Sequence, residues 1–394
     1  MICRFKKKYW IVFIILTLSL GGIGGSFQPS RIFLIISFIL IIQTKLDYNL
    51  KSSTGIGIII CAFWITYGLI SLIWSTLPIT GLNSELIVMS IGMLSLPVFG
   101  AVDKSENTID IIKYSWVGGA TIATLMGIYE ILTGNHFAFA DEGRVLGGIN
   151  IEVPFASGLF GNFNNFCAYL TICFPFTLWV FFEINKSLIK IPLSLLILSI
   201  ITLVLIDGSR TGILVLLIQL LYFIFSYVKV LIKNISIVVL ASFLLIFFVP
   251  WDTLLLVLNY RLGSTDQDAR SIMVTAGLEM LYLTYGFGVG AGSFEYYAMK
   301  MNTFDHIINP HNILIEIISQ YGIIIFVAFC FWLCHIFIKT IRNNYIEKGA
   351  KVAIQILIIT IPLIGVMNSN ALGYIYWWVV FGSLCTIADS TTNY

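Results

Sequence analysis

The sequence predicts an all-α, polytopic membrane protein, and three observations support this fold class. First, 58% of the 394 residues are hydrophobic, only 11% are charged, and the mean hydropathy is +0.96. Second, apolar runs long enough to cross about 30 Å of hydrocarbon recur along the whole chain. Third, the centres of these runs are nearly free of charge, with Glu130 and Glu183 standing at run ends. Such a chain is too apolar to fold around a soluble core.

The apolar runs predict about twelve membrane spans along the chain. Their approximate ranges are 9–24, 31–44, 55–74, 86–102, 111–132, 163–183, 191–206, 211–228, 235–250, 313–338, 352–366 and 371–389. The first, second and eleventh runs are short for a full crossing, so we expect little tilt or a locally thinned bilayer there. We see no internal repeat, low-complexity tract or soluble domain, and we expect residues 1–394 to form a single integral membrane domain.

The basic residues predict the orientation of the spans. The N-terminal residues Arg4 and Lys6 to Lys8 precede an apolar run, as in a signal peptide, but no small-residue cleavage motif follows. We therefore expect a retained first helix. If the N-terminus is cytoplasmic, every loop on that side holds at least two lysines or arginines, as the positive-inside rule requires. Both termini are then expected in the cytoplasm.

Six of the 22 basic residues fall on the opposite side, and five of these six are arginines. They are Arg31, Arg144, Arg210, Arg261, Arg270 and Lys300. A planar guanidinium suits bidentate contacts with phosphate or carboxylate, so these residues predict an anionic ligand at the outer membrane surface. The alternative is that individual arginines pair with nearby acids, which are Asp141, Asp207, Asp266 and Asp268.

Composition argues against three other kinds of site. The net charge of +2 is spread over separate loops, which does not suit nucleic acid. The seven cysteines form no C-x-x-C pair, so neither a disulfide framework nor a zinc site is predicted. The outer loops hold no Asp-x-Asp pair beyond the two acids flanking Gln267, and we expect neither a metal nor a cofactor.

The two largest outer segments, 133–162 and 251–312, are the places where a site can be built. The first leads into Asn162, Asn164 and Asn165 at a span entry, where asparagines cap helices or bind sugar hydroxyls. In the second, apolar and polar residues alternate unevenly from Asp268 to Tyr285, which predicts an amphipathic helix on the outer surface. Arg270 would stand at the headgroup level within reach of Arg261, or the helix would simply anchor the chain at the interface.

Three shorter motifs complete the candidates. Arg210, in Asp207–Gly212, stands where a span begins, so the positive helix end would strengthen its attraction for an anion. The alternative is a snorkelling arginine paired with Asp207. The glycines of Gly286–Phe294 lack the βαβ context of a nucleotide loop and predict a flexible or closely packed turn. In Pro310-His311-Asn312, the asparagine suits a helix cap and His311 suits proton exchange, with Glu316 one turn beyond.

These motifs together resemble the O-antigen ligase and polysaccharide polymerase family of bacterial membrane glycosyltransferases. The matching residues are Gly158–Asn165, Ser209–Gly212, Arg270, Gly286–Phe294 and Pro310–Glu316 with Gly322, over roughly residues 140–335. Phe163 departs from the family, which often has proline there. The resemblance implies a GT-C-like fold, a place in the bacterial cytoplasmic membrane, and transfer of a glycan from undecaprenyl pyrophosphate to a sugar hydroxyl at the outer face of that membrane.

The resemblance also implies roles for particular residues. Arg210 and Arg270 would hold the pyrophosphate, and His311 would act on the acceptor hydroxyl or leaving group. The expected substrate-binding residues are Arg144, Arg261, Asn162, Asn165, Asn312 and Glu316. Expected partners are the lipid-linked oligosaccharide, membrane lipid, a flippase and a chain-length regulator.

The sequence leaves other functions open. A polymerase extends a lipid-linked glycan, whereas a ligase transfers it to lipid A-core or another acceptor. We favour the polymerase because no docking domain for a large second substrate is visible. A polysaccharide flippase or other transporter would place ionisable residues near the membrane centre and repeat its halves, and neither feature is evident here. A non-catalytic scaffold would leave the outer arginines and His311 without a role.

Overall fold

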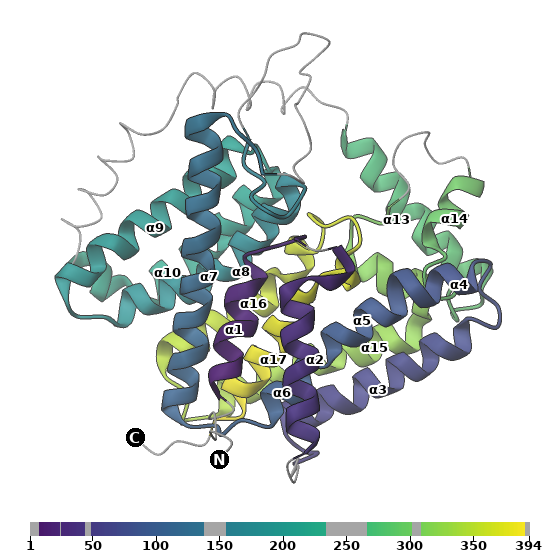
Figure 1. Ribbon diagram of the computed structural model, residues 1–394, viewed down its shortest axis with the longest axis horizontal. Coiled ribbons are helices and arrows are strands. Elements are labelled where there is room, and N and C mark those ends of the chain that lie inside the picture. The colour runs from purple at the N-terminus through teal and green to yellow at the C-terminus, as the bar shows by residue number, and fades with distance from the viewer. Residues whose placement is uncertain are drawn as a thin grey trace.

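A computed structural model describes residues 8–23, 25–43, 49–137, 155–233, 266–301 and 309–390 (Figure 1). In these ranges the chain forms helices and turns and no strand, which confirms the all-α fold class. The helices are α1 (Lys8–Leu18), η1 (Gly25–Phe27), α2 (Pro29–Ile42), α3 (Ser53–Ser71), α4 (Pro78–Thr80), the π-helix η2 (Gly81–Leu86), α5 (Ile87–Met93), α6 (Ser95–Gly100), α7 (Glu106–Thr133), α8 (Phe163–Glu183), α9 (Ser187–Ile206), α10 (Arg210–Lys233), α13 (Asp266–Leu283), α14 (Phe294–Lys300), α15 (Ile313–Arg342), α16 (Lys348–Ile364), η3 (Ala371–Gly373) and α17 (Ile375–Ala388).

Seven helical stretches of the described chain are long and apolar enough to cross a membrane. They are α3, the stretch Pro78–Gly100, α7, α8, α9, the first part of α10 and α15. The expected short spans are indeed short helices, with 11 residues in α1, 14 in α2 and 17 in α16. The predicted span 235–250 lies outside the described residues, so the total of twelve stays a prediction.

Helices α8 and α17 form the centre of the molecule. Every residue of α8 from Asn165 to Phe182 is buried, and so is every residue of α17. A helix that is apolar on all sides suits surroundings of other helices or of lipid, and α8 and α17 are surrounded by helices. Helices α7, α9, α10 and α16 pack around α8, while α3, α5 and α6 pack against α17.

Two carboxylates organise the end of the bundle where α1 begins and α17 ends (Figure 1), which we call the basic end. Asp389 accepts hydrogen bonds from the backbone N–H groups of Ser53, at 2.8 Å, and Thr54, at 3.0 Å, and forms an ion pair with Lys339. These contacts cap α3 and tie it to α15 and α17.

Asp103 precedes α7 at the same end. Partial burial alone would raise the pKa of Asp103, but hydrogen bonds from Ser105 and Thr108 outweigh it and hold that pKa below its ordinary value of 3.8. The positive charge of Lys8 acts in the same direction. The carboxylate form of Asp103 is therefore favoured in the folded protein.

Helix α15 is interrupted at Gly322, whose φ of 75° and ψ of −177° are not helical. Residues 286–292, which we call the glycine loop, lie against this interruption. The N–H of Val289 donates to the carbonyl of Ser319 at 2.8 Å, and the N–H of Ile323 donates to a loop carbonyl at 2.9 Å. Backbone groups released by the break are thus satisfied by the loop, as a membrane-embedded chain requires.

The glycine loop approaches α15 so closely that a side chain would not fit at its centre. A Cβ at Gly288 would lie 2.6 Å from the carbonyl oxygen of Gln320 and 2.7 Å from the nitrogen of Gly322. The alternating glycines therefore form a closely packed turn, one of the two forms that the sequence predicted.

A small hydrophobic cluster joins α13 and α14 to the first turns of α15. Its buried members are Met273, Ala276, Met280, Val289, Phe294, Ala298, Ile315 and Ile318. The opposite side of these turns, including Ile317 and Tyr321, packs into the main core. The amphipathic helix predicted from Asp268 onward is thus present as α13, and it packs its apolar face against α15.

Candidate active site

Four connections meet at the end of the bundle opposite the basic end, and we call this the loop end. They are residues 155–162, 207–210, 309–312 and 365–374. Helix α7 runs from the basic end to the loop end, whereas α8 and α15 run back again. The connections predicted to lie on the outer side of the membrane are therefore together in space.

Two buried carboxylates hold the connection before α8. Oε2 of Glu130, in the last turn of α7, accepts hydrogen bonds from the N–H groups of Ser157 and Gly158, both at 2.7 Å. Oδ1 of Asp207 accepts one from the N–H of Ala156 at 2.7 Å. Both acids are at most 1% exposed, so their hydrogen bonds to the backbone fix this connection against α7 and α9.

The asparagines at the start of α8 have structural roles. The side chain of Asn162 accepts from the N–H of Asn164 at 2.7 Å, which confirms a cap at this entry. Asn165 is buried, donates to the hydroxyl of Tyr374 at 2.5 Å and accepts from Asn368 at 2.9 Å. Asn165 therefore joins α8 to the connection between α16 and α17.

Arg210 is the first residue of α10, as the sequence predicted. Gly208, with φ of 60°, makes the tight turn from α9, and the hydroxyl of Ser209 lies 3.5 Å from the sulfur of Met367. Arg210 thus stands at the loop end, where the positive end of the α10 dipole adds to its charge.

His311 immediately precedes the cap of α15. The side chain of Asn312 accepts from the N–H groups of Leu314, at 2.9 Å, and Ile315, at 3.3 Å, which confirms the predicted cap. His311 has a φ of 44°, a left-handed conformation that is uncommon outside glycine. Such backbone strain is concentrated at functional sites, so this geometry supports a role for His311.

Glu316 joins α15 to the connection between α16 and α17. It is 2% exposed, and its carboxylate accepts from the N–H groups of Ala371, at 2.8 Å, and Leu372, at 3.4 Å. Glu316 therefore orients η3 beside the start of α15.

The connection 365–374 was not singled out by the sequence, yet it contacts three of the predicted motifs. Met367 meets the Arg210 turn, Asn368 meets Asn165, and Ala371 meets Glu316. The available signal was the polar run from Asn368 to Asn370 between two apolar spans on the predicted outer side.

The remaining arginines are only partly located. Arg144 and Arg261 lie outside the described residues, and Arg270 is described by its backbone as the fifth residue of α13. A Cβ at Gly277 would touch the side chain of Ile315, so α13 contacts the first turn of α15 at Gly277. Arg270 precedes Gly277 by seven helical residues, which is about 10 Å towards the N-terminus of α13. Arg270 therefore lies beyond the first residue of α15.

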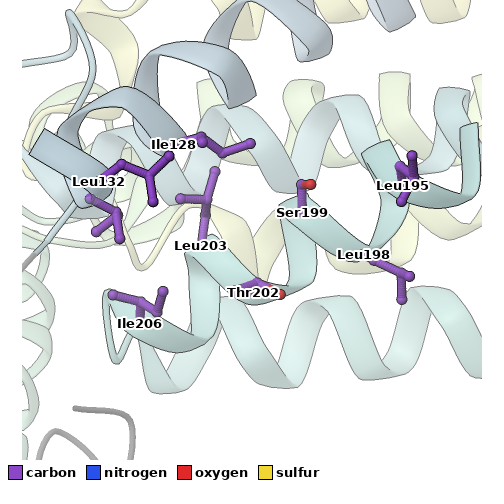
Figure 2. A pocket seen from close by; sticks show the side chains of 9 residues that line it. Ile128, Leu132, Leu195, Leu198, Ser199, Thr202, Leu203 and Ile206 are labelled. Carbon is purple, nitrogen blue, oxygen red and sulfur yellow. The ribbon is translucent and has the colours of Figure 1, made fainter. Parts of the chain in front are cut away.

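An apolar groove of about 240 Å³ lies between α7 and α9 (Figure 2). It is lined by side chains of both helices, among them Ile128, Leu132, Leu195, Ser199, Thr202 and Ile206. Leu132 lies two residues beyond Glu130, and Ile206 directly precedes Asp207. The groove therefore reaches the loop end.

The fold and its loop end define a polytopic α-helical membrane protein with polar connections gathered at one end of its bundle. Residues 193–330, which include Arg210, Arg270 and His311, match the O-antigen ligase family model. The teichuronic acid biosynthesis protein TuaE of Bacillus subtilis (strain 168) is 26% identical over 283 residues, which cover 68% of this chain and 57% of TuaE. The chain thus spans little more than half the length of this relative. These similarities confirm the resemblance to the O-antigen ligase and polysaccharide polymerase family.

Proposed function

We propose that the protein is a polysaccharide polymerase that transfers a glycan from undecaprenyl pyrophosphate to a sugar hydroxyl at the outer face of the bacterial cytoplasmic membrane. The observation that carries this proposal is the strained backbone of His311 at the capped start of α15. The connection 365–374 contacts both the Arg210 turn, through Ser209, and the first turn of α15, through Glu316. A flippase would supply the lipid-linked substrate, and a chain-length regulator would limit the product.

The proposed step forms one bond and breaks another. The acceptor oxygen bonds to the anomeric carbon of the donor while the bond from that carbon to the pyrophosphate oxygen breaks. His311 takes the proton of the acceptor hydroxyl as attack proceeds. Arg210 and Arg270 stabilise the charge on the departing lipid pyrophosphate, with Arg144 and Arg261 as further contacts, so the step balances without a metal.

The apolar groove between α7 and α9 supports a lipid-linked donor. A polyprenyl chain needs an apolar path that begins where its pyrophosphate is held. Ile206 lines the groove in Figure 2, and it precedes Arg210 by four residues in the sequence. We propose that the isoprenoid units nearest the pyrophosphate lie in this groove.

The test uses alanine variants of His311 and Arg210, expressed at matched levels in a strain that lacks the gene. The matched controls are His335→Ala, in the other half of α15, and Arg342→Ala, at its basic end. Glycans are then resolved by size. Loss of long chains with accumulation of single lipid-linked repeat units supports the polymerase, whereas an unchanged glycan profile refutes a catalytic loop end.

Two other functions give different results in the same assay. Long lipid-linked chains that accumulate unattached would indicate a ligase. A transporter is favoured by one observation, the interruption of α15 at Gly322, because transporters bind their substrates at discontinuous helices. Here the interruption is filled by the glycine loop. Accumulation of lipid-linked units on the cytoplasmic side would support transport.

A further inference from the structure

A polar cavity of about 220 Å³ lies beside Pro310 at the loop end. Four separate parts of the chain line it, through Glu85 of η2, Glu295 of α14, Pro310 with Glu316 and Gln320 of α15, and Asn370 before η3. Glu316 and Gln320 are 2% exposed, whereas Asn370 is exposed. The cavity therefore has a buried polar floor and an open rim.

Gln320 carries a buried hydrogen-bond acceptor that the fold does not use. Its side-chain amide hydrogen-bonds to Glu85, and Glu85 also accepts from the hydroxyl of Tyr321 at 2.5 Å. No group among the described residues donates to Oε1 of Gln320, although this atom is buried. A buried acceptor without a donor is costly, so this position suits a ligand that carries a hydroxyl or amino group.

The charge of the lining limits the ligand further. Three carboxylates line the cavity, and no lysine, arginine or histidine does so among the described residues. Carboxyl groups accept hydrogen bonds from hydroxyl groups, and Glu316 keeps acceptor capacity beyond its two backbone contacts. Because no basic side chain of the described residues lines the cavity, a phosphate would find no counter-charge there, so the lipid pyrophosphate does not belong here.

Size and position complete the argument. Pockets for drug-sized ligands occupy roughly 300–1,000 Å³, so this cavity suits a single sugar ring. Pro310 of the lining is adjacent in sequence to His311. A ring bound in the cavity would therefore lie next to the connection 309–312, which carries His311.

We propose that this cavity binds the terminal monosaccharide of the acceptor glycan, through hydroxyl groups that donate to Gln320, Glu316 and Glu295. This assignment rests on the proposed function and divides the loop end into two parts. Arginines hold the anionic donor, and the acidic cavity holds a neutral or amino sugar.

The test measures binding to the purified full-length protein in detergent by saturation-transfer NMR. The probes are the methyl glycosides of glucose, N-acetylglucosamine, glucosamine and glucuronic acid, with inorganic pyrophosphate as competitor. The variants are Gln320→Leu on the floor and Glu295→Ala on the wall. The control is Asn344→Ala, an exposed turn residue after α15.

We expect saturable binding of at least one neutral or amino glycoside, about tenfold weaker in either cavity variant and unchanged in Asn344→Ala. The glucuronide should bind at least tenfold more weakly, and pyrophosphate should not compete. Glu295→Ala keeps the test valid if Gln320→Leu fails to fold. Absence of binding by every neutral and amino glycoside, equal binding of the glucuronide, or insensitivity to both variants would overturn the assignment.

The binding assay does not depend on catalysis, so it separates the two proposals. If His311→Ala abolishes glycan assembly but no glycoside binds, the cavity assignment is wrong and the proposed function stands. If glycosides bind as expected but His311→Ala leaves assembly unchanged, the transferase proposal is wrong and the cavity remains a sugar site.

Discussion

Replacing Gly288 by alanine tests whether the glycine loop must touch α15 directly. Gly288 has a φ of 81°, and a Cβ there would lie 2.6 Å from the carbonyl oxygen of Gln320. Gly286 provides a matched control, because its φ is 87° but its Cβ would meet nothing nearer than a methyl group of Ile323 at 3.6 Å. Both substitutions strain the backbone, and only one creates a clash.

The expected magnitudes follow from these two effects. A left-handed backbone costs an alanine about 1–2 kcal/mol, which applies to both variants. Forcing an atom into a packed contact adds about 1–3 kcal/mol, which applies only to Gly288→Ala because both nearest atoms belong to the backbone. We therefore expect losses of about 1–2 kcal/mol for Gly286→Ala and about 2–5 kcal/mol for Gly288→Ala.

The assay is thermal denaturation of the purified protein in one detergent at one scan rate, since unfolding of such proteins is often irreversible. Gly288→Ala should have the lower midpoint of the two variants. Equal midpoints would refute the reasoning, because the glycines would then be needed only for their dihedral angles and not for close approach to α15.

The remaining predictions use the same assay. Glu130→Gln should cost about 1.5–3 kcal/mol, because a charged acceptor of two backbone N–H groups is lost; an unchanged midpoint would mean that water replaces it. Asp389→Asn should lower the free energy of unfolding by about 1–3 kcal/mol, and adding Lys339→Met should recover part of this loss. If the two losses simply add, the side chains of Asp389 and Lys339 do not stabilise each other. The pKa of Asp103 is lowered in the folded protein, so its stabilisation should be fully present above pH 3.8 and lost as the pH falls through the folded-state pKa. The thermal midpoint of Asp103→Asn should therefore differ from that of the wild type at pH 7 but not in strong acid.

Local features of the loop end could be predicted from the sequence. Asn312 and the start of α10 at Arg210 were both predicted correctly, because caps and span boundaries depend on a few neighbouring residues. The positions of the loops at one end followed from the distribution of lysines.

Contacts between distant segments could not be predicted in this way. The hydrogen bond that the N–H of Ala371 donates to Glu316 joins residues 55 positions apart, and no local pattern specifies such a pair. The positive φ of His311 was equally hidden, because most histidines still have a negative φ and the sequence does not mark this one as an exception. The partner of the glycine loop was hidden because a single glycine does not reveal that α15 is interrupted at Gly322 or that residues 286–292 lie against the interruption.

The small hydrophobic cluster around α13 has a consequence for how related proteins could change specificity. Ile315 and Ile318 pack into this cluster, whereas Ile317 and Tyr321 pack into the main core. Substitutions on α13 or α14 therefore press on one side of the turns that follow His311 and leave the membrane bundle intact. Substitutions in the α13 cluster could therefore shift the position of the site while the packing of the main core stays the same.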